Sequence, residues 1–263
     1  MPMTPRASEI YQLIDQIAPF DTAEDFDNAG FLIGSQDQRV EAVLCTLDVT
    51  KEVVREAEKA GVQLIISHHP LFFKGHKNLL EGDPEVDVIC EMVRARLSLI
   101  SAHTNLDKTF YSGSACAARA LGLENIRQEG YLFIGDMPKD AKVNASGLKN
   151  IMHEKLRAPL RMYGEETASI RTLAIAGGAY GEGYHEIIEK NLGAQAYLTG
   201  EIRHHEALDA VERGLVIYDG GHYATERLLV PELASYLQNA LDALKYSVRV
   251  YPSTCVSFPG ALE

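Results

Sequence analysis

The chain has 263 residues, a length that suits one large domain or two small ones. Hydrophobic residues make up 46% of it and charged residues 24%, which leaves enough apolar material for a buried core. The 25 basic and 37 acidic residues give a formal charge of −12. This charge disfavours general nucleic-acid binding because an acidic surface repels phosphate backbones. A single nucleotide is still compatible with it, since a bound cation reverses the local field.

The four cysteines lie far apart and show no C-x-x-C spacing, which argues against a disulfide framework and against a cysteine zinc site. They are Cys45, Cys90, Cys116 and Cys255. We expect them to be buried free thiols in a reducing compartment. The N-terminus lacks the apolar run of a signal peptide, and no stretch approaches the roughly 20 apolar residues of a membrane span. We therefore expect a cytoplasmic protein that has no membrane partner.

The first half of the chain alternates between predicted helices and strands. The predicted helices are residues 8–18, capped by Ser8 and ended by Pro19, residues 50–60, capped by Thr50, and residues 83–96, begun by Asp83-Pro84. A loop is expected around residues 27–30. The predicted strands are residues 40–48, 62–67 and 97–102. This β-α-β-α-β order is typical of a parallel or mostly parallel sheet with helical crossovers.

The same alternation recurs after a polar, turn-rich stretch over residues 129–144. Ser146 begins a predicted amphipathic helix. The strands predicted after it are residues 170–176, 195–199 and 215–218, and the helices between them are residues 182–191 and 201–213. The last predicted elements are a helix over residues 228–244, interrupted or kinked at Pro231, and a strand over residues 246–251.

This order predicts an α/β fold made of two similar domains, a pseudo-repeat with mostly parallel sheets. We place the first domain at residues 1–125 and the second at residues 126–226, and expect residues 227–263 to pack back onto the first. Three echoes support the repeat. They are Gly61-Val62-Gln63 with Gly193-Ala194-Gln195, His68-His69 with His204-His205, and His103-x-x-x-Asp107 with His222-x-x-x-Glu226. A chance echo of common α/β punctuation is the alternative.

Histidines and carboxylates gather where predicted buried strands end, the edge at which open α/β sheets bind ligands. The clusters are Ser67-His68-His69-Pro70, Ala102 to Asp107, and His204-His205 with Gly221 to Glu226. Residues four apart share one face of a helix, so His222 and Glu226 can point the same way. Imidazole and carboxylate suit divalent zinc, iron or manganese. The pattern therefore predicts a metal site, with satisfied structural histidines as the alternative.

A glycine-rich stretch follows the predicted strand over residues 170–176. Its pattern is Gly177-Gly178-x-x-Gly181-x-Gly183. It fits neither the P-loop pattern nor the spaced dinucleotide fingerprint. A tight strand-to-helix turn is therefore favoured over a phosphate-binding loop.

Five motifs, in order along nearly the whole chain, resemble the NIF-three-like family, also known as GTP cyclohydrolase I type 2. They are Phe-Asp-Asn-Ala-Gly (26–30), Ser-His-His-Pro-Leu-Phe-Phe (67–73), Ala-His-Thr-Asn-Leu-Asp (102–107), Leu-Thr-Gly-Glu-Ile-Arg-His-His (198–205) and Gly-His-Tyr-Ala-Thr-Glu (221–226). Phe26 stands where many members carry Trp. The chain matches the short form, which lacks the domain that some members insert between the halves.

The resemblance implies two α/β domains with a dinuclear metal centre in the cleft between them, two divalent ions per chain (zinc, iron or manganese), and a homohexamer. Carried over by motif, His69 and Asp107 hold one metal, His68 and His222 hold the other, and Glu226 bridges. His103 falls beside the site as a proton carrier or outer partner. The residues expected to line the cleft are Glu201, His204 and His205, with a solvated helix start as the alternative for the two histidines.

The resemblance also implies a metal-dependent hydrolase. Its family name suggests GTP as the small-molecule substrate, attacked on the purine carbon between the two imidazole nitrogens. Two other functions remain open at this point. One is a two-metal phosphoesterase, since the same centre suits phosphoester hydrolysis. The other is a metal-binding, chaperone-like or scaffold protein without turnover, because metal ligands look alike in enzymes and in binding proteins.

Overall fold

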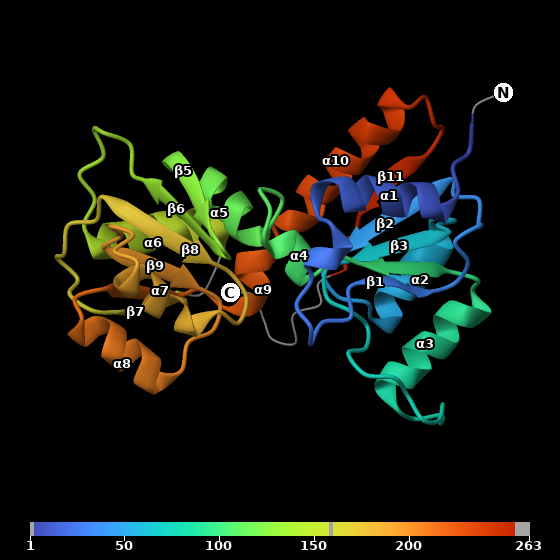
Figure 1. The fold of residues 1–263 in the computed structure, drawn as a ribbon, viewed down its shortest axis with the longest axis horizontal. Helices are drawn as coiled ribbons and strands as arrows, with labels where there is room; N and C mark the ends of the chain where they lie inside the picture. Colours follow the sequence, from blue (N-terminus) through green and yellow to red (C-terminus); the bar gives the residue numbers. More distant parts are fainter. Residues whose placement is uncertain (1–2, 158–159, 256–263) are drawn as a thin grey trace. The chain divides into compact units, whose positions relative to one another are not determined.

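The computed structural model describes residues 3–157 and 160–255, which divide into two compact units (Figure 1). The first unit comprises residues 3–109 and 230–255, and the second lies within residues 110–229. The division precedes α5 (Gly113–Leu121), so it comes earlier than the boundary expected near residue 125. It does so because α5 packs on strands and helices of the second unit. No helix among the described residues is both long and apolar enough to cross a membrane.

The first unit is built on a five-stranded sheet in the order β1-β4-β3-β2-β11. Its strands are β1 (Gly30–Ile33), β2 (Ala42–Thr46), β3 (Leu64–Ser67), β4 (Ser98–Ser101) and β11 (Arg249–Pro252). All neighbours are parallel except β1 and β4, which confirms the parallel sheet expected here. The prediction missed β1, because its run Phe31-Leu32-Ile33 is short and follows the turn signal at residues 27–30.

Helices cover both faces of this sheet. They are α1 (Ala7–Ile17), α2 (Lys51–Lys59), α3 (Pro84–Arg94), α4 (Thr104–Asp107) and α10 (Leu229–Ala243), with a short 3-10 helix at Phe20–Thr22. Helices α2 and α3 pack on one face, and α1 and α10 lie on the other (Figure 1). Pro231 does not interrupt α10, because it sits in the first turn, where the backbone needs no intrahelical N–H bond.

Two helices begin at caps other than those predicted. Helix α1 begins one residue before Ser8, and the Glu9 carboxylate accepts the backbone N–H of Arg6 at 2.8 Å. Helix α6 (Ala145–Leu156) is capped by Asn144 in place of Ser146. In both cases a side chain one turn away satisfies an amide that the helix itself leaves without a partner. Thr50 caps α2 as predicted.

Asp83 caps α3 as predicted, and its carboxylate accepts the N–H groups of Glu85 and Val86 at 3.0 and 3.3 Å. Asp83→Ala removes both bonds and is expected to lower the free energy of unfolding by about 1 kcal/mol. Asp83→Ser keeps a side-chain oxygen at the cap and is the matched control. Urea unfolding of the three proteins provides the measurement. Equal stability of the alanine and serine variants would contradict a capping role.

The second unit has a six-stranded sheet in the order β5-β6-β8-β9-β10-β7. Its strands are β5 (Glu124–Glu129), β6 (Leu132–Asp136), β7 (Arg161–Tyr163), β8 (Thr172–Ala176), β9 (Ala196–Thr199) and β10 (Val216–Asp219). Only β8–β9 and β9–β10 are parallel, so this sheet is mixed, in contrast to the mostly parallel sheet expected. The difference arises from the β5–β6 hairpin, which overlaps the stretch interpreted as polar turns, and from the edge strand β7.

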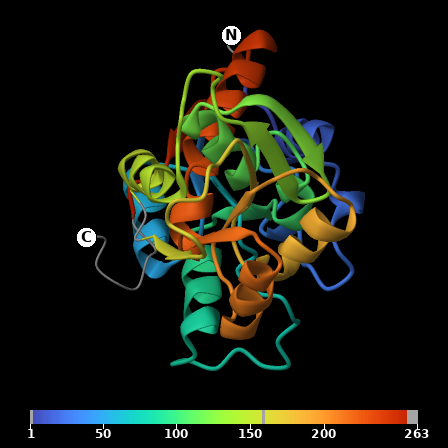
Figure 2. The ribbon, with the colours of Figure 1, turned by 90° about the vertical axis from the view of Figure 1, so that its left-hand side faces the viewer.

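Helices cover both faces of the second sheet as well. Helices α5 and α6 pack on one face, and α7 (Tyr184–Glu189) and α8 (His204–Glu212) pack on the other (Figure 2). A 3-10 turn over Gly181–Gly183 precedes α7, and α9 (His222–Glu226) follows β10.

The two units share a topology, which confirms the pseudo-repeat. The order β1-β4-β3-β2 in one matches β7-β10-β9-β8 in the other, with the first strand antiparallel in both. The two glutamines at matching positions make the same hydrogen bonds. The side-chain oxygen of Gln63 accepts the N–H groups of Glu41 and Ala42. That of Gln195 accepts the N–H groups of Arg171 and Thr172. The added parts are the β5–β6 hairpin in one unit and α10 with β11 in the other.

Candidate metal-binding site

Each unit carries a set of ligand-type side chains at the carboxyl ends of its parallel strands. In the first unit, His68 and His69 follow β3, His103 precedes α4 after β4, and Asp107 is the last residue of α4. In the second unit, Glu201 follows β9, and α9 begins at His222 and ends at Glu226. Strand ends at one sheet edge bring residues together that are far apart in the sequence. Apart from Glu201, this is the strand-end placement that the sequence predicted for these residues within each half.

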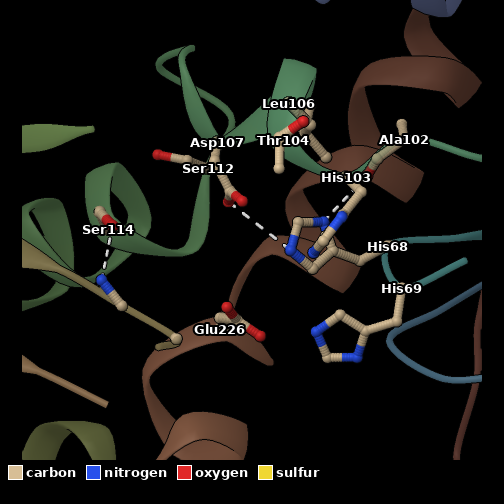
Figure 3. A network of polar contacts seen from close by, with 12 residues as sticks. His68, His69, Ala102, His103, Thr104, Leu106, Asp107, Ser112, Ser114 and Glu226 are labelled. Atoms are coloured by element: carbon tan, nitrogen blue, oxygen red, sulfur yellow. Dashed lines mark hydrogen bonds and ion pairs between the residues drawn. The ribbon is translucent and has the colours of Figure 1, made fainter. Parts of the chain in front are cut away.

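The first-unit set is a tight cluster of imidazoles beside a carboxylate (Figure 3). His68 is fully buried, and its Nε2 lies 3.6 Å from Asp107 Oδ1. His68, His69 and His103 each offer one ring nitrogen, and these three atoms lie within 4.8 Å of one another. The ring centroids of His68 and His103 are 5.1 Å apart. Three ligand-type nitrogen atoms and a carboxylate therefore lie together at one edge of the sheet.

Every histidine of this cluster has its Nδ1 next to an oxygen acceptor. The acceptors are the Ala102 carbonyl for His68 at 2.9 Å, the Asp48 carboxylate for His69 at 2.7 Å and the Asp27 carboxylate for His103 at 2.9 Å. An acceptor on Nδ1 fixes the proton there and leaves the lone pair of Nε2 for a ligand. Metal-binding histidines in proteins are held in this way.

Two of these acceptors, Asp48 and Asp27, were not singled out from the sequence. Asp48 closes the strand predicted over residues 40–48, so its position at the ligand-binding sheet edge was a usable signal. Asp27 lies in the Phe-Asp-Asn-Ala-Gly motif, but that motif precedes β1 and is far in sequence from His103. Only the fold shows that the loop before β1 reaches α4.

The second-unit set is smaller and partly buried. The side chains of His222 and Glu226 share one face of α9, and His222 Nε2 lies 3.0 Å from Glu226 Oε2. Glu226 is only 6% exposed. The Nδ1 of His222 lies 2.7 Å from Glu201 Oε1, so this histidine is oriented like those of the first unit. Glu201 thus contacts the predicted ligand His222, whereas His204 and His205 are the exposed first residues of α8.

The glycine-rich stretch after β8 packs closely against α9. Gly178 has a φ of +65°, and a Cβ there would lie 2.1 Å from Glu226 Oε1. Its N–H donates to Thr225 Oγ1 at 3.1 Å, and the N–H of Gly177 donates to Ser114 Oγ at 2.9 Å. The tight-turn interpretation is therefore the right one. Absence of a side chain lets the backbone approach the Glu226 carboxylate.

The donor chemistry of both sets fits a divalent metal. Neutral imidazole nitrogens and carboxylate oxygens are ligands of zinc, iron and manganese, and the two sets contain no thiol. Burying a carboxylate such as Glu226 is costly unless a positive charge or good hydrogen bonds compensate it. A divalent cation would supply that charge. The observed residues therefore match the kind of group that the sequence motifs imply.

Comparison with known proteins places these motifs in a family. The model of the family Duf34/NIF3 (NGG1p interacting factor 3) matches residues 5–259. A Campylobacter jejuni relative named GTP cyclohydrolase 1 type 2 homolog is 31% identical over 234 residues, which cover 89% of this chain and 92% of the relative. A relative of the same name from Streptomyces coelicolor is 30% identical, with 97% of this chain and 93% of that protein covered.

Solved structures show the same fold. The crystal structure of a Staphylococcus aureus hypothetical protein matches with a TM-score of 0.92 and 29% identity, and covers 99% of both chains. A Bacillus cereus protein related to NIF3 matches with a TM-score of 0.91 over 98% of this chain and 99% of that one. At 21% identity, the second likeness is one of fold alone.

Proposed function

This chain belongs to the Duf34/NIF3 (NGG1p interacting factor 3) family, and from that premise we propose that it is a dinuclear metal-dependent hydrolase. The observation that carries the proposal is the shared state of the site histidines. His68, His69 and His222 each have Nδ1 beside an oxygen acceptor, and each has a carboxylate or a second imidazole close by. Structural histidines have no need of so uniform an arrangement.

The ligand count supports a centre to which both sets contribute. Because Glu201 lies at Nδ1 of His222, the second-unit set leaves His222 and Glu226 as ligands, fewer than the three or four protein ligands that one ion takes. The first-unit set offers more than one ion needs if a position is to stay open for water. The pairing of ligands follows the family resemblance, by which His69 and Asp107 would hold one metal, His68 and His222 would hold the other, and Glu226 would be shared between them. Zinc, iron and manganese all suit these donors.

When bound, two such ions would lower the pKa of a water molecule to about 7 and would thereby supply a nucleophile at neutral pH. The chain's own residues then have separate tasks. Asp48 and Glu201 orient His69 and His222. His103, held by Asp27, moves a proton at its Nε2 to or from the reacting atoms.

We propose GTP as the first substrate to test, because the curated relatives carry the name GTP cyclohydrolase 1 type 2 homolog. Attack of water on the purine carbon between the imidazole nitrogens opens the ring and leaves a formamide. A second water releases formate. A phosphoesterase acting on the same nucleotide releases phosphate instead, so the two products separate the two reactions.

Protein loaded with zinc, manganese or iron(II) is expected to release formate from GTP, and Asp107→Ala is expected to abolish that release. Asp140→Ala, which removes an exposed carboxylate of the second unit, is the matched control. Phosphate without formate would favour the phosphoesterase. If no metal gives either product, and Asp107→Ala changes metal content alone, the protein binds metal without turnover and the hydrolase proposal is wrong.

A further inference from the structure

We infer that Asp27 is a positioning residue that fixes the tautomer and orientation of His103, so that His103 presents an unprotonated Nε2 at the His68–His69 cluster. His103 is the one imidazole of this cluster that the sequence motifs do not assign to a metal. Its ring lies 5.1 Å from that of His68 and 5.6 Å from that of His69, between centroids. Because the His103 ring lies so close to candidate metal ligands, it must be held in one orientation to act as a proton carrier alone.

The Asp27 carboxylate is built to accept hydrogen bonds only. Its side chain is fully buried. Oδ1 accepts the N–H of Asn28 at 2.7 Å and faces His103 Nδ1 at 2.9 Å, while Oδ2 accepts both the N–H and the hydroxyl of Thr104. These four contacts occupy the roughly four lone-pair positions that a carboxylate offers. Although burial would raise the pKa of Asp27, the hydrogen bonds from His103 and Thr104 hold that pKa well below its usual value.

An ionised carboxylate has no proton to donate, so the hydrogen between Asp27 and His103 belongs to Nδ1. A neutral imidazole carries one N–H, and Nε2 is then left with a free lone pair. Hydrogen bonds to backbone groups also keep His103 in place beside Asp27. The side chain of Asn105 accepts the N–H of His103 at 2.9 Å and donates to the Ala18 carbonyl at 2.7 Å. The ring can therefore neither turn over nor change tautomer without breaking buried contacts.

The pseudo-repeat gives independent support. His103 follows β4 and precedes Asp107 by four residues, as His222 follows β10 and precedes Glu226 by four. The two histidines thus hold matching positions in the two units, and each has a carboxylate on Nδ1. The carboxylates come from different places, since Asp27 precedes β1 and Glu201 follows β9. Unrelated parts of the chain supply the same contact at the same position of the repeat.

The tautomer can be measured directly. Proton–nitrogen correlation spectra of the full chain, labelled with heavy nitrogen in histidine, are recorded at a pH about two units above the ordinary histidine pKa of about 6.5. Zinc-loaded and chelator-treated samples are compared, and His103→Gln identifies the His103 signals by their loss. We expect His103 to show a protonated Nδ1 and an unprotonated Nε2 in both samples. A protonated Nε2 in the wild type would overturn the inference, and this test needs no variant of Asp27.

Asp27→Asn is the sharper variant because it keeps the shape. The asparagine amide has a single acceptor oxygen, yet the N–H groups of Asn28 and Thr104 approach the two different oxygen positions of Asp27. The full set of hydrogen bonds that holds His103 therefore cannot be kept. We expect the Nδ1-protonated form to stop being the only state. Asp25→Asn, two residues away and exposed, should leave the spectrum unchanged. An unchanged His103 spectrum in a folded Asp27→Asn protein would refute the positioning role.

The consequence for turnover rests on the proposed function. Removing such an orienting partner typically costs about 10- to 100-fold in activity. We expect Asp27→Asn to lower kcat by that factor, with KM and metal content near those of the wild type. A loss of metal equal to that of a ligand variant would instead make Asp27 a structural support of the metal site. The wild-type spectrum supports or refutes the inference even where GTP is not turned over, so the two failures can be told apart.

Discussion

Glu226→Gln is expected to reduce bound metal from about two ions per chain, the number that a dinuclear centre holds, to one or fewer. Two cations close together need a shared anion, and the neutral amide cannot provide one. Glutamine has nearly the same shape, and Glu226 lies among closely packed atoms at 6% exposure. The change therefore removes charge with little change in packing. Metal content by elemental analysis of gently purified protein is the measurement.

The matched control for this variant is Glu212→Gln, an exposed carboxylate at the end of α8 in the same unit. It should keep the metal content of the wild type. The metal-free Glu226→Gln protein should unfold at no lower urea concentration than the metal-free wild type, because a buried charge has been removed. A wild type that holds almost no metal, even after incubation with zinc, manganese or iron(II), would show that the histidine clusters are structural.

Gly178→Ala is expected to have the second large effect, through the backbone. Alanine at a φ of +65° costs roughly 1–2 kcal/mol by itself. Its Cβ would also lie 2.1 Å from Glu226 Oε1, so the carboxylate or the turn must move. Overpacking of this kind costs about 1–3 kcal/mol more. We expect a marked loss of both metal content and the free energy of unfolding, measured on the same preparations.

Gly193→Ala separates the two contributions. Gly193 has a φ of +77°, and no heavy atom of the described residues lies within 4 Å of a Cβ built there. This variant should show the backbone cost alone and should keep its metal. If Gly178→Ala and Gly193→Ala lose equal stability and both retain metal, the close approach of Gly178 to Glu226 has no role in the site.

Much of this fold follows from local patterns. The strands β2, β3 and β4 are short apolar runs bounded by turn signals, and they were predicted as such. Thr50 and Asp83 correctly indicated where α2 and α3 begin. The topology then brings the histidines to the strand ends without further information. The His222–Glu226 spacing also predicted the local geometry correctly, since residues four apart on α9 lie on one face of the helix.

Other parts depend on contacts that no local pattern encodes. The apolar run from Leu132 to Ile134 is short and lies within a polar stretch of sequence, so it was not predicted as a strand. It forms β6 because it pairs with β8 and is buried there. The contact of Asp27 with His103 joins residues 76 positions apart. Likewise, the need for glycine at position 178 arises from α9, which lies more than forty residues later in the sequence. Such features require the tertiary structure.

The position of β11 has a consequence for synthesis of the chain on the ribosome. The second unit is inserted between two segments of the first, and β11 pairs with β2 across the edge of a sheet whose other strands are made much earlier. Until residues 249–252 emerge, the outer edge of β2 lacks its partner and is a template for pairing with other chains. Domains generally fold as units during translation, so the inserted unit can fold while the first still waits for its last strand. Truncation before β11 should therefore harm the first unit and promote aggregation, although it removes none of the candidate metal ligands.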